Sequence, residues 1–307
     1  MAIKSYKGFD KNLRCRGFQY KIGGIYEMDG KIKMCNRGFH ACESPFDVFD
    51  YYTMIDSRFC EVEQDGNISK WDRGTKICSS KIKIKAELKL ADMINLGVEW
   101  LKEITSPEKI KTSIKDNSSG NNAQIGSSGD GAKISSSGYD ARIGSSGYRA
   151  QIGSSGDGAK IGSSGYRAKI GSSGNNAQIG SSGNNAKIGS SGDGAKIGSS
   201  GYDAQIGSSG DGAQIGSSGD GAQISSSGYG AKIDSTGEDC VIMCAGINSV
   251  AKASKGSWVT LSEWSYSEEK QRYIPICVKT EFVDGEKIKA DTYYSLKGGV
   301  FVEWIND

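Results

Sequence analysis

One nine-residue phrase repeats from about Ser118 to Gly246 without an insertion, and one version of it reads Ala-Lys-Ile-Gly-Ser-Ser-Gly-Asp-Gly. Its isoleucines fall nine residues apart, from Ile125 to Ile242. Alanine precedes nearly every isoleucine by two places, and glycine follows every one by four. A constant period over this length predicts a repeat architecture in which each unit packs on its neighbours.

The residue types within one phrase predict a short strand followed by a turn. Side chains alternate between the two faces of a strand, so Ala159, Ile161 and Ser163 share one face and Lys160 and Gly162 the other. The face with alanine and isoleucine must point inward. The following Ser-Gly-Tyr-Arg segment turns the corner, where glycine is free to adopt positive φ.

Nine residues are too few to enclose a core, so we expect two phrases to form one flattened coil of eighteen residues. Coils stacked at roughly 4.8 Å would pair each strand with those above and below it. The isoleucines then predict about seven coils and a rod on the order of 33 Å long. Ile161 should lie beside Ile143 and Ile179 in one sheet, with Ile152 and Ile170 in the other.

Two other readings of the repeat are weaker. A helix of period 3.6 is excluded by Gly-Ser-Ser-Gly in most phrases. A disordered Gly/Ser linker has no need of regularly spaced alanine and isoleucine. The sequence thus predicts a mainly β protein: a parallel β-solenoid, flanked by an N-terminal α+β domain and a C-terminal antiparallel β cap.

We expect domains at residues 1–110, 111–252 and 253–307. In the first, strands are predicted at residues 18–22, 31–35, 59–63 and 81–88, and a helix start with Ser44 as its cap. A second helix should end near Thr105 and cap the first coil, with Ile114 and Asp116 in an imperfect entry repeat. In the last domain, strands are predicted at residues 258–261, 276–279, 282–283, 288–289, 292–295 and 300–304.

Composition and charge indicate which partners and which cellular compartment to expect. The net charge of +2 over 307 residues implies no global attraction to nucleic acid or membrane. We expect no secretory signal, because the first residues lead directly into charged ones, and no membrane span, because no apolar run approaches the necessary length. The eight cysteines are scattered, so we interpret them as mostly reduced and expect a cytoplasmic protein.

Three segments carry a resemblance to a known family. Residues 16–20 read Arg-Gly-Phe-Gln-Tyr, residues 37–42 Arg-Gly-Phe-His-Ala-Cys and residues 46–52 Phe-Asp-Val-Phe-Asp-Tyr-Tyr. They resemble an uncharacterised domain frequent in phage and prophage proteins. There the domain is often followed by Ser/Gly/Ala/Ile repeats and an ending similar to residues 256–261 and 284–291. The resemblance implies a phage or prophage setting within a host cell, and brings no established activity or catalytic residue.

The N-terminal domain offers weak signals for catalysis. His40 and Cys42 could act as base and nucleophile if that segment is extended, although no third orienting group is evident. Arg16, His40 and the acidic pair Glu61 and Glu63 faintly resemble an ADP-ribosyltransferase-like arrangement. No paired cysteine spacing suggests zinc, so we predict no metal, no cofactor and no assigned catalytic residue. An enzyme in residues 1–110 stays as the alternative function.

The turns of the solenoid allow two functional interpretations: a calcium-binding β-roll or a surface that binds a partner. Aspartates do not recur as a repeating ligand set, which argues against calcium. Tyr148-Arg149 and Tyr166-Arg167 fall on the same corner, one coil apart. Tyrosine and arginine are enriched at binding hot spots, and paired arginines suit an anionic group.

We therefore predict a non-catalytic binding or structural protein, an inhibitor or scaffold acting on a host component. Its contact patch is predicted at Tyr148, Arg149, Tyr166 and Arg167. The expected partner is a protein or a small anionic ligand of the host. A homo-oligomer is left open.

Overall fold

The computed structural model describes residues 2–72, 74–106, 117–118 and 120–305. Two compact units divide the chain, Met1–Trp100 and Leu101–Asp307, and each is described by itself. The entry repeat expected at Ile114 and Asp116 lies outside the described residues, as does the expected boundary after residue 110.

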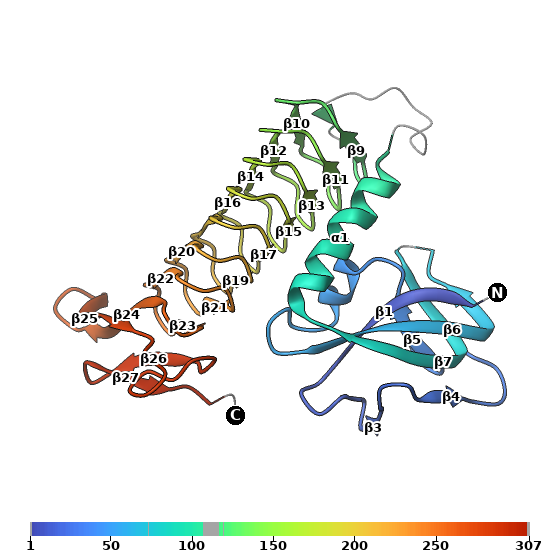
Figure 1. The fold of residues 1–307 in the computed structure, drawn as a ribbon, viewed down its shortest axis with the longest axis horizontal. Helices are drawn as coiled ribbons and strands as arrows, with labels where there is room; N and C mark the ends of the chain where they lie inside the picture. The colour runs from blue at the N-terminus through green and yellow to red at the C-terminus, as the bar shows by residue number, and fades with distance from the viewer. Residues whose placement is uncertain (1, 73, 107–116, 119, 306–307) are drawn as a thin grey trace. The chain divides into compact units, whose positions relative to one another are not determined.

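The N-terminal unit is built around a small antiparallel barrel (Figure 1). Its strands follow the order β4-β7-β5-β1-β6, and β6 also pairs with β7, so the last four strands form a closed ring. The elements are β1 (Ile3–Phe9), β2 (Arg14–Cys15), β3 (Phe18–Gln19), β4 (Ile25–Glu27), β5 (Phe39–Cys42), the 3-10 helix η1 (Phe46–Asp50), β6 (Arg58–Lys70), β7 (Lys76–Leu88) and the larger part of helix α1 (Leu90–Ile104). The end of α1, from Leu101, belongs to the second unit. This confirms an α+β unit before the repeats.

One local prediction in this unit was wrong, and another was confirmed only in part. Residues 31–35 form no strand: only an isolated bridge joins Lys33 to Arg37, and the positive φ of Cys35 (62°) reverses the chain there. The helix expected after Ser44 is a single short 3-10 helix. The Ser44 hydroxyl still accepts a hydrogen bond from the Asp47 N–H, at 3.4 Å.

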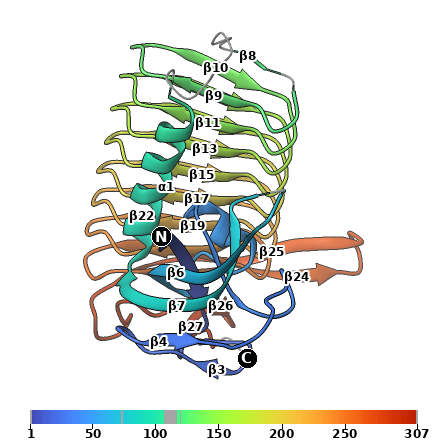
Figure 2. The same cartoon turned by 90° about the vertical axis from the view of Figure 1, so that its right-hand side faces the viewer.

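The repeats form a parallel β-solenoid with two sheets (Figure 2). One sheet contains β10 (Lys133–Ser136), β12 (Gln151–Ser154), β14 (Lys169–Ser172), β16 (Lys187–Ser190), β18 (Gln205–Ser208), β20 (Gln223–Ser226) and β22 (Val241–Cys244), after β8 (Asn117–Ser118). The other contains β9 (Gln124–Ser127), β11 (Arg142–Ser145), β13 (Lys160–Ser163), β15 (Gln178–Ser181), β17 (Lys196–Ser199), β19 (Gln214–Ser217), β21 (Lys232–Ser235) and β23 (Val250–Ala253). Ile161 pairs with Ile143 and Ile179 in one sheet, and Ile152 with Ile170 in the other, which confirms the eighteen-residue coil.

The solenoid makes about eight turns over residues 124–261, one more than the isoleucines alone predict. The register shows why. Ala251 follows Ile233 in one isoleucine column, and Val259 follows Ile242 in the other. Smaller apolar residues therefore continue the core after the nine-residue phrase has disappeared.

The inward face is the one expected from alternation. Ala159, Ile161 and Ser163 are fully buried, and the same residue types fill the core along the solenoid. The Ser163 hydroxyl accepts a hydrogen bond from the N–H of Gly165, at 3.3 Å, so this serine ties its strand to the turn that follows.

The turns use glycine differently from the prediction. The glycine that follows each isoleucine by four does not adopt positive φ; the residue two places later does. A Cβ on Gly174 would overlap the carbonyl of Gly156, the equivalent residue one coil earlier. Glycine is required there because two backbones approach closely. The positive φ two residues later is a separate requirement of the turn, which asparagine and aspartate also meet.

The expected cap over the first coil is also wrong. The last residues of α1 lie against the outer face of a sheet, since a Cβ on Gly126 would overlap the carbonyl of Thr105 and one on Gly144 would crowd Leu101. Outward glycines thus make room for this helix end on the side of the solenoid.

The C-terminal residues close the other end. β24 (Trp258–Ser267) continues the stack in parallel with β22, then pairs antiparallel with β25 (Arg272–Phe282). β26 (Tyr294–Lys297) pairs with β23 and with β27 (Val300–Glu303). Val283, Ile288, Tyr294 and Leu296 are buried in the solenoid core and cover its last coil. Residues 288–289 are not a strand.

Candidate anion-binding site

The four residues of the predicted patch lie together on one corner of the solenoid. The rings of Tyr148 and Tyr166 stack, with centroids 5.7 Å apart and planes 13° from parallel. Each guanidinium covers the ring beside it: Arg149 lies 4.9 Å from the Tyr148 centroid, and Arg167 lies 5.2 Å from that of Tyr166. The two tyrosines are about 40% exposed, against 52–56% for Tyr139, Tyr202 and Tyr229, because each covers part of the other.

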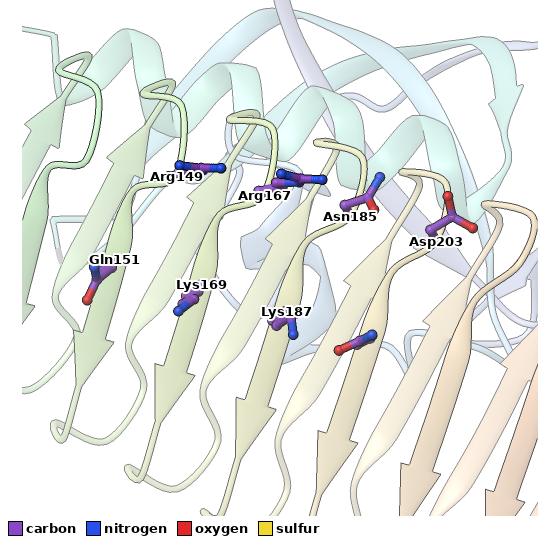
Figure 3. A pocket seen from close by; sticks show the side chains of 8 residues that line it. Arg149, Gln151, Arg167, Lys169, Asn185, Lys187 and Asp203 are labelled. Carbon is purple, nitrogen blue, oxygen red and sulfur yellow. The ribbon is translucent and has the colours of Figure 1, made fainter.

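A groove of about 520 Å³ lies beside this corner, and the two arginines line it (Figure 3). Its wall consists of two rows that run along the stack. The turn row is Arg149, Arg167, Asn185 and Asp203, and the strand row is Gln151, Lys169, Lys187 and Gln205. Each strand-row residue begins a strand two places after its turn-row residue, so the rows are parallel.

The groove is strongly cationic. Four of its eight residues carry a positive charge and one, Asp203, a negative charge, so the formal charge of the wall is +3. In the described part of the chain none of the four cations forms an ion pair. Lys169 and Lys187 are register partners on adjacent strands, where like charges repel. An anion in the groove would relieve this repulsion.

The backbone of both arginines is strained. Arg149 and Arg167 have φ of 54° and 57°, the left-handed region that costs a residue with an ordinary side chain roughly 1–2 kcal/mol. The equivalent place in every other described turn from residue 122 to residue 248 holds glycine, asparagine or aspartate, which tolerate this conformation. The two exceptions are one coil apart on one corner and line one groove, a coincidence that favours a functional role.

Lys169 and Lys187 were not among the residues predicted for this site. Lys169 and Lys187 follow Arg167 and Asn185 by two places, and that spacing was a usable signal, because alternation puts both members of such a pair on the outside. A second, shallower hollow of about 610 Å³ continues over the strand face, with Lys133 at its far side. It exists because Gly153 and Gly171 put no side chain on this face.

The turn carboxylates serve the stacking of coils. Oδ1 of Asp130 accepts a hydrogen bond from the N–H of Tyr148, and Oδ1 of Asp157 one from that of Asn175, at 3.0 and 2.7 Å. Asparagine serves equally, as in the bond from the Asp193 N–H to Asn175. This explains why aspartate and asparagine exchange freely at this place. No group of three or more potential metal ligands gathers among the described residues.

The histidine and cysteine of the N-terminal unit lie on one strand, with His40 and Cys42 on the same face of β5. The imidazole Nε2 of His40 accepts a hydrogen bond from the Cys35 N–H, at 3.0 Å. Burial, then the charges of Lys76, Lys7 and Arg16, lowers the pKa of His40 to about 4. This imidazole is therefore uncharged at neutral pH and a weak base, which does not favour His40 as the base for a Cys42 nucleophile.

A buried amine lies close to these residues. The Nζ of Lys7 is within hydrogen-bonding distance of the Cys15 sulfur (3.4 Å) and the His40 carbonyl (3.0 Å), and the Tyr52 hydroxyl lies 3.1 Å from the same sulfur. Burial lowers the pKa of Lys7 and raises that of Tyr52. Nothing in the sequence pattern identifies this cluster, because the three residues come from distant segments.

The carboxylates of the ADP-ribosyltransferase-like arrangement are engaged in surface ion pairs. Glu61 pairs with Lys4 and Glu63 with Lys85, each at 2.8 Å. Arg16 lies in the turn between β2 and β3, with φ of 50°.

No helix of the described residues is long and apolar enough to span a membrane. Comparisons with curated proteins and with solved structures find no match. One family model matches the N-terminal unit, and the repeats and the C-terminal cap lie outside that match. Residues 3–96 are similar to the family described as "Domain of unknown function (DUF7666)".

Proposed function

We propose that this protein is a non-catalytic binding protein whose solenoid holds an acidic segment of a partner protein in the groove beside Tyr148 and Tyr166. The observation that carries the proposal is the set of four cations, Arg149, Arg167, Lys169 and Lys187, without an ion pair among the described residues. Keeping such charges close together has a cost that bound carboxylates would offset.

The geometry favours an elongated ligand over a compact one. The two rows extend over several coils, each coil adding roughly 4.8 Å. The tyrosine stack adds a flat apolar surface next to the two arginines, and tyrosine and arginine are both frequent at binding hot spots. A peptide that carries several carboxylates can follow both rows, whereas a single small anion reaches only one pair of cations.

The resemblance to phage and prophage proteins supplies the biological setting of the proposal. In that setting the acidic segment belongs to a host component in the cytoplasm, and the protein acts as an inhibitor or scaffold. The N-terminal unit, matched to a domain of unknown function, is then a second module on the same chain.

Calorimetric titration with a synthetic octaglutamate peptide tests the proposal. Arg149→Gln with Arg167→Gln should weaken binding at least tenfold, equivalent to about 1.4 kcal/mol. Lys270→Gln with Lys297→Gln is the control, because it removes the same charge from exposed positions outside the groove. Equal loss in both variants would mean unspecific attraction, and tighter binding of inorganic phosphate than of the peptide would contradict an elongated ligand.

A further inference from the structure

The last strand of one solenoid sheet has an open edge. β25 has only β24 as a neighbour in the described sheet, and its eleven residues extend along the hairpin that projects from the stacked strands (Figure 2). An open edge of this length offers a row of backbone donors and acceptors to another strand.

The register identifies which backbone groups face the open edge. The N–H of Val283 donates to the carbonyl of Ser257, the residue before β24, so the odd-numbered residues just before Val283 also direct their backbone groups toward β24. Val278, Thr280 and Phe282 consequently direct theirs to the open edge. Their side chains share the outer face of the sheet, since Thr280 pairs with Thr260 and their hydroxyls lie 2.8 Å apart.

That outer face is unusually apolar where the solenoid ends. The polar and glycine columns of the sheet give way to exposed apolar side chains: Val241, Met243, Trp258, Ile276, Val278 and Phe282 are between 41 and 62% exposed. Their columns adjoin in the register, because Val241 pairs with Trp258 and Trp258 with Phe282. An exposed apolar patch beside an open strand edge marks an interaction surface.

We propose that a second copy of this chain pairs with β25, antiparallel, across a two-fold axis at Thr280. This register places Lys279 opposite Glu281 of the second copy and Glu281 opposite its Lys279, so both charges meet an opposite charge. It also places Val278 opposite Phe282 on the apolar face. Axes at Val278 or Ile276, the neighbouring residues with the same backbone orientation, would leave these two charges opposite uncharged residues.

The two-fold axis gives a self-complementary interface, as closed dimers require. The pairs 278–282, 280–280 and 282–278 each exchange two backbone hydrogen bonds. The solenoid sheet then continues from one copy into the next, with both apolar patches on one side. Glu281 already binds Lys279 and Lys287 of its own chain, at 3.0 Å each, so it is held in place near the edge.

Sedimentation equilibrium of the full chain tests the dimer, with three charge variants. Lys279→Glu and Glu281→Lys should each weaken dimerisation at least tenfold, because each puts like charges opposite one another. The double variant, Lys279→Glu with Glu281→Lys, restores opposite charges and should recover most of the affinity. Lys270→Glu changes charge outside the pairing and should leave dimerisation unaltered.

A fourth variant tests the backbone pairing itself. Thr280→Pro removes an N–H from the open edge and should abolish the dimer, while its melting curve at low concentration shows that the chain still folds. A monomeric parent protein at 100 μM would overturn the proposal. Dimerisation that resists both single charge reversals, or a double variant no better than the singles, would overturn it too.

Discussion

The carboxylate oxygen Oδ1 of Asp193 accepts a hydrogen bond from the backbone N–H of Asp211, eighteen residues later, at 2.9 Å. Asp211 repeats the contact to Tyr229, at 2.7 Å. One side-chain oxygen thus adds a link between successive coils at the corner, beside the backbone hydrogen bond from the Gly194 N–H to the Asp211 carbonyl. The turn residue that seems most variable in the sequence is in part a structural link between coils.

The stability of the solenoid should depend on the hydrogen-bond acceptor at Asp193 and not on the charge of that side chain. Asp193→Ala removes the acceptor and leaves the N–H of Asp211 without its side-chain partner, which should lower the free energy of unfolding by about 1 kcal/mol. Asp193→Asn keeps an oxygen at the same place and should change stability by much less. Urea unfolding of both variants makes the comparison, and equal losses would show that charge is what counts.

The same arrangement predicts independence from calcium. Five turn aspartates accept hydrogen bonds from backbone N–H groups: Asp130, Asp157, Asp193, Asp211 and Asp220. Because no three potential metal ligands gather among the described residues either, EDTA should leave the melting temperature unchanged, and added calcium should not raise it. Circular dichroism during heating measures both. Loss of the β signal on chelation would make the solenoid a calcium-dependent roll.

Two glycines three residues apart should respond oppositely to alanine. Gly174→Ala forces a Cβ into the carbonyl of Gly156 and should cost about 3 kcal/mol or more. Gly171→Ala points into open space on the outer face, where a Cβ meets no atom within 4 Å, and should be neutral or slightly stabilising. If both variants lost stability alike, close backbone approach would not explain the glycine of the turn.

Acid should weaken the N-terminal unit through His40. Its folded pKa, about 4, is below the ordinary value of 6.5, so the unfolded chain binds more protons between these pH values. Stability is complete above about pH 6.5 and falls as the pH approaches 4. At pH 5 the loss should be about 1 kcal/mol, discounted for partial exposure of the ring.

Urea unfolding at pH 7 and pH 5 measures this loss. His40→Gln provides the comparison, because it removes the only histidine of the chain and with it this share of the pH dependence. A variant with the same pH dependence as the parent protein would assign the effect to other groups.

The sequence predicted what depends on repetition. Ile161 and its neighbours had to alternate sheets once two phrases made a coil, so architecture and register followed from period and pattern. The strand predicted at residues 31–35 was wrong because Cys35 adopts a left-handed backbone conformation, which the pattern of side chains does not indicate. The predicted number of turns was one too low for a related reason, since Ala251 and Val259 occupy positions that isoleucine holds in earlier coils.

The candidate site was predicted in part, on the same principle. Tyr148 and Tyr166 could be paired because they are eighteen residues apart, and the stack follows from that spacing. The cluster of Lys7, Cys15 and Tyr52 could not be found, because no period relates β1 to the segments that bring its partners. Contacts between segments of different sequence depend on the tertiary fold, and a local sequence pattern gives no information about them.

The strained arginines give the most direct test of the binding proposal. If Arg149 and Arg167 occupy left-handed positions for the sake of a ligand, replacing both with asparagine should stabilise the solenoid and impair binding together. Asparagine already fills the same place at Asn185, one coil further along the row. The double variant should be about 1 kcal/mol more stable.

The measurement combines urea unfolding of Arg149→Asn with Arg167→Asn and titration of the same variant with octaglutamate peptide. We expect a higher midpoint of unfolding and at least tenfold weaker binding. A variant that binds the peptide as tightly as the parent protein would contradict the assignment of the groove as the binding site.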